Sequence, residues 1–427
     1  MVSLVSMYDY ENLDVDYDIS KQKALESWLN VSFRYLSSLD WRSFNKRNGT
    51  DSRDIGETYR YLSYLTDFFR DFFVKNSIDI VTISLECFLW NLVAYYVARR
   101  LGIPVINMVT SRIPKRGLMF GTEDSTAFCC WNEDAKEVHW DEIYSFYAGR
   151  TELKYTNVKE GLAAYWHPKI MIDNLNKARK YLATRRFMVR TYKYEKVALL
   201  PVTTEVTRAI WATIRGIINR AFFQKPVRNE QFFFLPLHYE DDANITMMEP
   251  FTNQFELVAS ISRCLPQGVK LYVKPHPGYM GTDIRFRDFL RISKLKNVRI
   301  LHPLVSPISL IKDSIGVITL NNTTGFEAMI FDKPVISLGH DFYCRPDLCY
   351  MVKAWDELPD IIFKVFRERT PRSSPGHFRN FAKLVYRNTV FTKGDIYFAD
   401  DPLTDEDGAN VAYALDKIFR KIEMQNK

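Results

Sequence analysis

In the first part of the chain, apolar residues recur at the spacing of a helix. Further on, stretches with the spacing of a strand alternate with stretches that have helical spacing. From residue 20 to 75, apolar side chains recur every three to four positions, and the aromatic run at 59–73 predicts a helix packed on several sides. The pattern then predicts a strand, a helix and a second strand over residues 78–84, 86–100 and 103–108. Two strands joined by a helix form a βαβ unit, which is typical of a doubly wound parallel sheet.

The second half of the chain repeats this alternation more clearly. The predicted strands are FFFLPL (232–237), KLYVKP (270–275), NVRIL (297–301), IGVITL (315–320) and PVISLG (334–339). Predicted helices lie between them, near residues 253–264, 284–294 and 306–313 and from about residue 324, and a last helix is predicted over 407–424. Strands that alternate with helices predict an α/β fold, here with a second Rossmann-like domain.

A basic amphipathic segment lies between the two halves. Residues 206–228 contain five basic residues and no acidic one, interleaved with Trp211 and several isoleucines and phenylalanines. Such a helix can lie on an anionic membrane face, or it can connect two domains with its basic side in solvent. Both interpretations are open at this point.

Composition narrows the class of protein. The chain has 427 residues, enough for two domains, with 47% apolar and 26% charged residues, as in soluble globular proteins. The formal net charge of +7 permits anionic ligands without specifying one. The six cysteines form no CxxC pair, which favours reduced thiols in the cytosol, and the amino-terminal residues do not resemble a secretory signal. We therefore expect a cytoplasmic protein.

The stretch KPHPG places two polar side chains directly after a predicted strand. Pro275 and Pro277 restrict the backbone on both sides of His276, and Lys274 precedes them. A loop held in this way presents an imidazole and an ammonium group at low entropic cost, which suits a phosphate or a sugar hydroxyl. A structural histidine in a proline-rich turn is the alternative.

A polar turn follows a later predicted strand in LNNTTGFEAM. We expect Thr323 or Thr324 to cap the next helix, so that backbone N–H groups at its positive end point above the sheet and bind a phosphate or diphosphate. Glu327 is expected in the first turn of that helix, either as a cap partner or as an acceptor for a ribose diol.

Further candidates follow the first and last strands of the second half. His238 and Glu240 come after the strand at 232–237, either as ligand contacts or as loop-stabilising groups. Tyr343 follows the strand at 334–339, where its ring either stacks on a base or sugar or serves the structure.

The region of residues 230–345, with its HP pair and the NNTTGFEAMIFDKPVISLG stretch, resembles the capsular polysaccharide and surface carbohydrate biosynthesis proteins, a family of GT-B-type glycosyltransferases. The resemblance implies an α/β fold of two Rossmann-like domains that face each other across a cleft, with a nucleotide-activated sugar bound to the second domain. It further implies that Lys274 and His276 contact the donor phosphate, that Thr323, Thr324 and Gly325 surround it, and that Glu327 faces the ribose. The full predicted donor-binding set is His238, Glu240, Lys274, His276, Asn322, Thr323, Thr324, Gly325, Glu327 and Tyr343.

On this basis we predict four regions of the chain: an N-terminal acceptor-side domain at 1–205, a linker helix at 206–230, a C-terminal nucleotide-sugar-binding domain at 231–400 and a closing helix at 401–427. The chain has no DxD pair suited to hold a metal ion, and GT-B enzymes generally stabilise the leaving phosphate with basic groups and helix ends. No metal and no cofactor besides the donor, whose base is open, are therefore predicted.

The first domain is expected to supply the acceptor side. Glu86 follows a predicted strand and could act as the catalytic base, or support the transition state of a retaining reaction, or simply favour a helix start; His276 is the second predicted catalytic residue. Arg112, Lys115 and Arg116 lie in a loop that either clamps an anionic acceptor or phosphate or is solvated.

The predicted function is transfer of a sugar from a nucleotide-activated donor to a growing surface glycan, without a metal ion. The alternatives are a nucleotide-sugar 2-epimerase-like enzyme, a transferase of polyol phosphate from a cytidine diphosphate carrier, and a non-catalytic scaffold in polysaccharide assembly. The predicted partners are the nucleotide-sugar, a glycan or lipid-linked glycan acceptor, and the inner face of the membrane if residues 206–228 bind it; no nucleic acid is predicted.

Overall fold

A computed structural model describes most of the chain. The described residues are 18–39, 44–45, 50–51, 55–83, 89–110, 117–122, 127–132, 138–149, 211, 214, 218–219, 222–238, 254–276, 286–392 and 404–425. They fall into two compact units: the first contains the helices α1 to α4, and the second contains the described elements from β4 onward, with the boundary at the start of β3.

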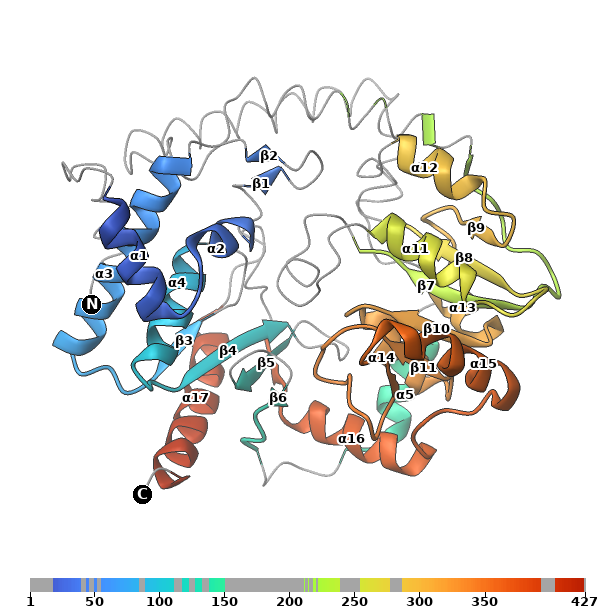
Figure 1. Cartoon of the computed structure of the whole chain (residues 1–427). Helices are drawn as coiled ribbons and strands as arrows, with labels where there is room; N and C mark the ends of the chain where they lie inside the picture. The colour runs from blue at the N-terminus through green and yellow to red at the C-terminus, as the bar shows by residue number, and fades with distance from the viewer. Residues whose placement is uncertain are drawn as a thin grey trace, which may run out of the picture. The chain divides into compact units, whose positions relative to one another are not determined.

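The first unit is helical, as the apolar period at 20–75 predicts (Figure 1). Its elements are α1 (Ile19–Leu29), α2 (Phe33–Leu39), α3 (Ile55–Lys75) and α4 (Leu89–Arg100), with the short antiparallel pair β1 (Phe44–Asn45) and β2 (Thr50–Asp51). Leu62 and Leu65 of α3 and Leu92 and Val93 of α4 are buried, so the two helices share an apolar interface.

A five-stranded sheet has the order β13-β5-β4-β3, with β6 paired to β5. Its strands are β3 (Val81–Ile83), β4 (Val105–Thr110), β5 (Gly117–Thr122), β6 (Ala127–Phe128) and β13 (Val390–Phe391). The predicted strands at 78–84 and 103–108 are confirmed as β3 and β4, and the helix between them as α4. The sequence did not predict β5, β6 and β13, which pair in antiparallel directions.

A six-stranded sheet forms the centre of the second half, with the order β12-β11-β10-β7-β8-β9 and parallel pairing throughout. Its strands are β7 (Phe232–Pro236), β8 (Lys270–Lys274), β9 (Val298–Ile300), β10 (Gly316–Thr319), β11 (Val335–Ser337) and β12 (Tyr350–Met351). All five strands predicted for this region are confirmed, and β12 is an additional edge strand. The fold is therefore mixed α/β with a parallel sheet.

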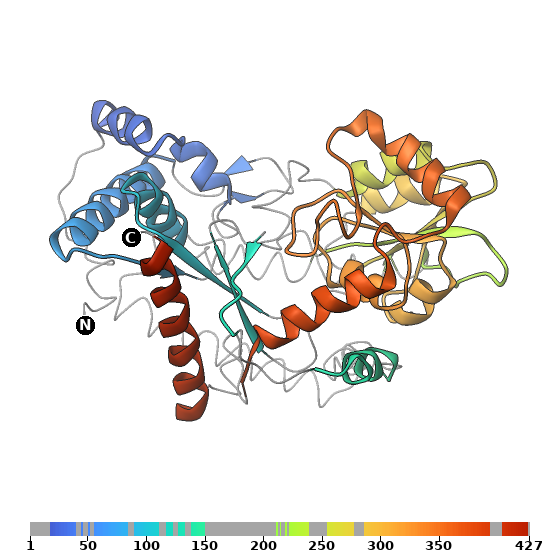
Figure 2. The same ribbon diagram turned by 90° about the horizontal axis from the view of Figure 1, so that it is seen from below.

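Helices cover both faces of the six-stranded sheet (Figure 2). One face carries α13 (Pro307–Asp313), α14 (Thr323–Ile330) and α16 (Pro375–Arg387), and the other carries α11 (Gln254–Arg263), α12 (Phe286–Ser293) and α15 (Leu358–Glu368), which the short helix η3 (Trp355–Glu357) precedes. The strand β7 explains this arrangement, because Phe232 and Phe234 enter one core cluster while Phe233 and Leu235 enter the other. A strand buried on both faces reads as a continuous apolar run.

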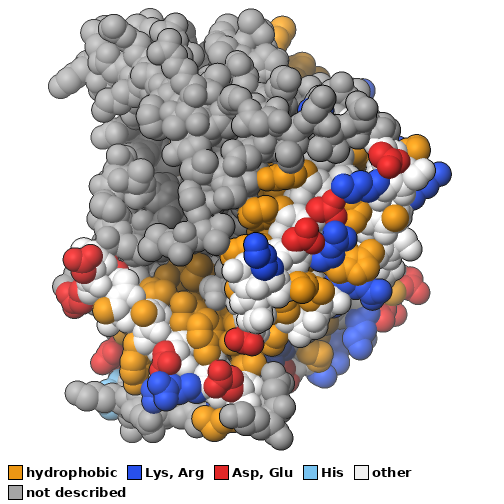
Figure 3. All heavy atoms as spheres, turned by 90° about the vertical axis from the view of Figure 1, so that its left-hand side faces the viewer, with side chains coloured by type: hydrophobic (Ala, Val, Ile, Leu, Met, Phe, Trp, Pro, Cys, Tyr) orange, Lys and Arg blue, Asp and Glu red, His pale blue; other side chains and the backbone are white. Residues whose placement is uncertain are grey.

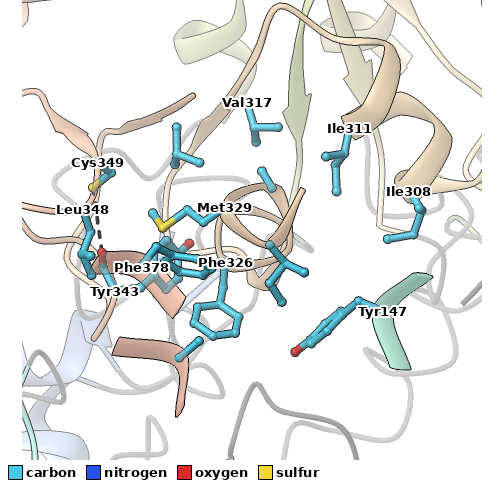
Figure 4. Close-up of a cluster of buried hydrophobic side chains, with 14 of the residues drawn as sticks. Tyr147, Ile308, Ile311, Val317, Phe326, Met329, Tyr343, Leu348, Cys349 and Phe378 are labelled. Atoms are coloured by element: carbon cyan, nitrogen blue, oxygen red, sulfur yellow. Dashed lines mark hydrogen bonds between the residues drawn. The ribbon is translucent and has the colours of Figure 1, made fainter. Parts of the chain in front are cut away.

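Helix α5 (Trp140–Ala148) packs into the core cluster on the face that carries α13, α14 and α16, although it precedes the sheet by more than eighty residues. Its Tyr147 is fully buried, and its ring contacts that of Phe326 on α14 at a centroid distance of 6.4 Å (Figure 4). The sequence did not predict this contact.

The last helix, α17 (Asp405–Gln425), covers the stretch 407–424 for which a helix was predicted. The carboxyl end of α16 is fixed to the segment that follows β6. There the side chain of Asn388 accepts hydrogen bonds from the backbone N–H groups of Trp131 and Asn132 at 2.6 and 2.9 Å. Lys421 of α17 donates to the carbonyl of Cys130 at 3.0 Å. The chain therefore returns to the neighbourhood of the five-stranded sheet after it leaves the parallel sheet.

Basic and acidic side chains of the described residues are interspersed on the face in Figure 3, in keeping with a mild net charge. No helix among the described residues combines the length and apolar composition needed to cross a bilayer. The predicted limits at residues 205, 230 and 400 and the predicted cleft between two domains stay predictions.

Candidate functional site

The candidate site lies where the strand order of the parallel sheet reverses. From β7 the chain proceeds outward through β8 to β9, and then it crosses to the other side of β7 and proceeds through β10 to β12 (Figure 1). Ligands of open α/β sheets bind at such a switch point, beyond the carboxyl ends of the strands. Here this position lies between the ends of β7 and β10.

Asn322 connects these two strand ends. It follows β10, and its side-chain Nδ2 donates to the carbonyl of Pro236, the last residue of β7, at 2.9 Å. Its backbone N–H donates to Oγ1 of Thr319 at 3.1 Å. Asn322 is buried, so both hydrogen bonds are shielded from water.

Asn322 is also the N-cap residue of α14, but its side chain makes no capping hydrogen bond. The expectation that Thr323 or Thr324 caps the helix was wrong, because the helix begins at Thr323 and both threonines lie inside its first turn. An asparagine side chain normally accepts from the second or third N–H of a helix. Since this one is directed to β7 instead, the amino end of α14 receives no N-cap side-chain hydrogen bond and retains the N–H groups and the positive helix end that attract anions.

Lys274 ends β8, beside β7, and its side chain is only 5% exposed. Among the described residues, its ammonium group makes no hydrogen bond and no ion pair. Burial lowers the pKa of Lys274 to about 8, and the negative charge of Glu327 opposes part of that effect. A buried lysine side chain whose ammonium group has no ion pair within 4 Å among the described residues costs free energy in the unliganded protein, although the charge of Glu327 offsets part of that cost. This position is therefore suited to an anionic ligand.

Glu327 and His276 complete this part of the site. Glu327 is buried in the second turn of α14, not in the first turn as expected, and it lies close enough to Lys274 to affect its pKa. His276 follows β8 and is half-buried. The structure thus places Glu327 of α14 near Lys274 of β8.

His238 follows β7 and is fixed by a residue that sequence reasoning missed. The side chain of Gln254, the first residue of α11, accepts from the His238 N–H at 2.9 Å and donates to the His238 carbonyl at 3.0 Å. Gln254 is buried, so this pair of hydrogen bonds sets the path of the chain beyond β7. A glutamine at the start of an amphipathic helix carries no local signal for such a contact.

Tyr343 is fully buried beneath the first turn of α14 (Figure 4). Its hydroxyl donates to the backbone carbonyl of Asn322. A Cβ atom placed on Gly325 would lie 2.6 Å from the Tyr343 hydroxyl oxygen, so only glycine allows this approach. A ring with no exposed surface offers no face to a base or sugar, and this placement differs from the predicted stacking role.

Several predicted residues lie outside the described part of the chain. They are Glu86, Arg112, Lys115, Arg116 and Glu240. Of the basic segment 206–228, the described residues are 211, 214, 218–219 and 222–228. Trp211, Ile214 and Ile218 are exposed, Asn219 is buried, and the rings of Phe222 and Phe223 pack against that of Phe289 on α12. Among the described residues, no group of three or more His, Cys, Asp or Glu side chains is arranged to hold a metal ion.

Comparison with known proteins identifies the family of the segment that contains this site. Residues 156–357 match the family model described as "Capsule polysaccharide biosynthesis protein". This region belongs to the capsule polysaccharide biosynthesis family. The resemblance predicted from the HP pair and the turn before α14 is thereby confirmed.

Curated relatives of this family match over a shorter range. The capsule polysaccharide modification protein LipB of Neisseria meningitidis is 27% identical over 127 residues, which cover 28% of this chain and 30% of LipB. The capsule polysaccharide export protein KpsS of Escherichia coli is 31% identical over 122 residues, or 26% of this chain and 31% of KpsS. The match thus spans less than a third of the length of these relatives.

Solved structures show more distant similarity. A chain described as Thermosulfurimonas dismutans KpsC, β-Kdo 2,7 transferase, is 15% identical, with 75% of this chain and 78% of that chain covered and a TM-score of 0.32. The UDP-GlcNAc 2-epimerase of Methanocaldococcus jannaschii is 14% identical, with 77% and 81% covered and a TM-score of 0.27. Similarity at this level supports no conclusion about the activity of this chain.

Proposed function

We propose that this chain is a glycosyltransferase of capsule polysaccharide biosynthesis, which moves a sugar from a nucleotide-activated donor to a growing surface glycan. The observation that carries the proposal is the buried ammonium group of Lys274, which makes no ion pair among the described residues and lies at the same sheet edge as the amino end of α14, without an N-cap side-chain hydrogen bond. Together they form a site for the phosphate of the donor.

In the proposed reaction, the bond between the sugar and the nucleotide phosphate breaks while the acceptor hydroxyl attacks, and negative charge develops on the leaving phosphate. Lys274 and the backbone N–H groups of Thr323 and Thr324 stabilise that charge without a metal ion, and His276 donates a further hydrogen bond. Glu327 accepts hydrogen bonds from the ribose. Groups that are fixed before the donor binds need no rearrangement during the reaction, and Asn322 is fixed by its contact with Pro236.

The acceptor side of the proposal rests on residues outside the described range. Glu86 is the proposed base for the acceptor hydroxyl, and Arg112, Lys115 and Arg116 are the proposed clamp for an anionic acceptor or phosphate. The proposed place of action is the cytoplasm, at the inner face of the membrane if the basic segment 206–228 binds anionic lipid.

Thermal shift with a panel of CMP, CDP, UDP, GDP and dTDP tests the proposal on the wild type, Lys274→Met and Lys270→Met. Lys270 lies at the other end of β8, where its ammonium group donates to the Lys296 carbonyl at 2.8 Å, so it is a matched control on the same strand. We expect at least one nucleotide to raise the melting temperature of the wild type and of Lys270→Met, but not that of Lys274→Met. A saturating ligand at about 100 times its Kd adds about 2.7 kcal/mol of stability, so the shift is measurable.

Two outcomes would contradict the proposal. If no nucleotide raises the melting temperature of the wild type, the chain has no donor site of the proposed kind, and a scaffold role in polysaccharide assembly is favoured. If the nucleotide raises the melting temperature of Lys274→Met as much as that of the wild type, the nucleotide binds to another part of the chain. Where binding occurs, the mass of the product distinguishes transfer of a sugar from transfer of a polyol phosphate.

A further inference from the structure

Tyr343 is a buried residue of the site that cannot contact a ligand directly, yet it contacts the backbone at the amino end of α14. Its hydroxyl donates to the Asn322 carbonyl, which also accepts from the Gly325 N–H at 3.0 Å. Its ring occupies the space that any side chain at Gly325 would need. The tyrosine therefore holds the N-cap residue and the first turn at once.

The loop that carries Tyr343 is itself fixed. The Tyr343 ring contacts those of Phe342 and Phe326 at centroid distances of 5.4 and 6.2 Å, and the thiol of Cys349 approaches its carbonyl at 3.9 Å (Figure 4). A side chain held in this way has few alternative rotamers, so its hydroxyl constrains the atom that it binds.

The geometry of the peptide bond transmits this constraint toward the ligand. A trans peptide is planar, so the carbonyl of one residue and the N–H of the next point in opposite directions. A hydrogen bond that fixes the Asn322 carbonyl on the core side therefore fixes the Thr323 N–H on the other side, beyond the amino end of the helix.

We propose that Tyr343 is a positioning residue, whose hydroxyl sets the orientation of the Asn322–Thr323 peptide and so presents the Thr323 N–H to the donor phosphate. This inference rests on the proposed function for the identity of the ligand. It gives Tyr343 an effect on nucleotide affinity without any contact between its ring and the nucleotide.

Tyr343→Phe tests the inference, because it removes the hydroxyl and keeps the ring against Gly325. Tyr350→Phe is the matched control, since Tyr350 is also buried and its hydroxyl donates to a backbone carbonyl, that of Thr370, at 3.1 Å. Two quantities are measured in both variants and the wild type: the affinity for the nucleotide of the panel that stabilises the wild type most, and hydrogen exchange of the amides from Gly325 onward.

We expect Tyr343→Phe to bind that nucleotide about five- to tenfold more weakly, the effect of one lost hydrogen bond, and to exchange the first amides of α14 faster. We expect Tyr350→Phe to keep the affinity and the exchange of α14 while its melting temperature falls by a similar amount. An affinity of Tyr343→Phe within twofold of the control would overturn the inference and leave the proposed function intact. If the wild type binds no nucleotide of the panel, the proposed function fails, and exchange alone decides on Tyr343: unchanged exchange overturns its positioning role, and faster exchange supports it.

Discussion

Two basic side chains on neighbouring strands of the parallel sheet, Arg299 of β9 and Lys274 of β8, differ in how their charge is compensated. Arg299 donates from Nε and Nη2 to the two carboxylate oxygens of Glu230, both at 2.9 Å, and its guanidinium lies 5.8 Å from the centre of the Tyr272 ring. Lys274 makes no ion pair among the described residues and is more deeply buried.

Their pKa values move in opposite directions as a result. The hydrogen bonds with Glu230 raise the pKa of Arg299, whereas burial lowers the pKa of Lys274 to about 8. A charge in a hydrogen-bonded ion pair stabilises the fold, while a buried charge without an ion pair costs free energy that an anion can offset when it binds. The comparison therefore separates a structural cluster from a binding site within one sheet.

The largest expected effect on stability belongs to the compensated charge. Arg299→Met leaves the Glu230 carboxylate without its bidentate partner, so the free energy of unfolding should fall by about 2 kcal/mol. Nucleotide binding should be retained, because Arg299 is committed to Glu230 and not to the site between β7 and β10. Urea unfolding and the nucleotide thermal shift measure the two quantities. If Arg299→Met loses the nucleotide response and keeps its stability, Arg299 serves the ligand and not the fold, which would contradict the comparison.

A smaller effect is expected at the packing contact of the site. Gly325→Ala places a Cβ atom 2.6 Å from the Tyr343 hydroxyl oxygen and 2.8 Å from its Cε2, so the ring must move. We expect a loss of about 1 to 2 kcal/mol in unfolding free energy, together with weaker nucleotide binding. Gly408→Ala in α17 is the control, because a Cβ there meets no atom within 4 Å and should stabilise the helix by about 0.5 to 1 kcal/mol. Equal urea midpoints for the two variants would show that Tyr343 does not fill this space.

The parallel sheet was predictable from the sequence because its strands are buried on both faces. Runs such as FFFLPL contain apolar residues only and stand between amphipathic helices, and this pattern gave all the strands from β7 to β11. The two-residue strands β6 and β13 are too short to show any period, and their pairing depends on residues far away in the chain. The contact of α5 with α14 could not be predicted either, because it also joins residues that are far apart in the chain.

The candidate site was predictable to the level of its strand ends. Lys274 and the turn before α14 stand out because parallel strands bring their carboxyl ends to one edge. The capping residue was predicted wrongly, since the partner of the Asn322 side chain is a carbonyl 86 positions earlier, at Pro236. The role of Tyr343 depends on its complete burial and on the missing side chain of Gly325, which no local pattern reveals.

The most direct test of the account is the affinity of the wild type and of Lys274→Met for the stabilising nucleotide, measured by calorimetry from pH 6.5 to pH 9.5. With a pKa of about 8, Lys274 is protonated at pH 7 and loses its charge as the pH rises through 8, while the phosphate stays anionic. Wild-type affinity should therefore be constant at low pH and fall by about tenfold up to pH 9.5, whereas the affinity of Lys274→Met should be weak and lack this decrease. Equal affinity of the two proteins at pH 7, or a wild-type affinity that does not change with pH, would contradict the claim that Lys274 binds the donor phosphate.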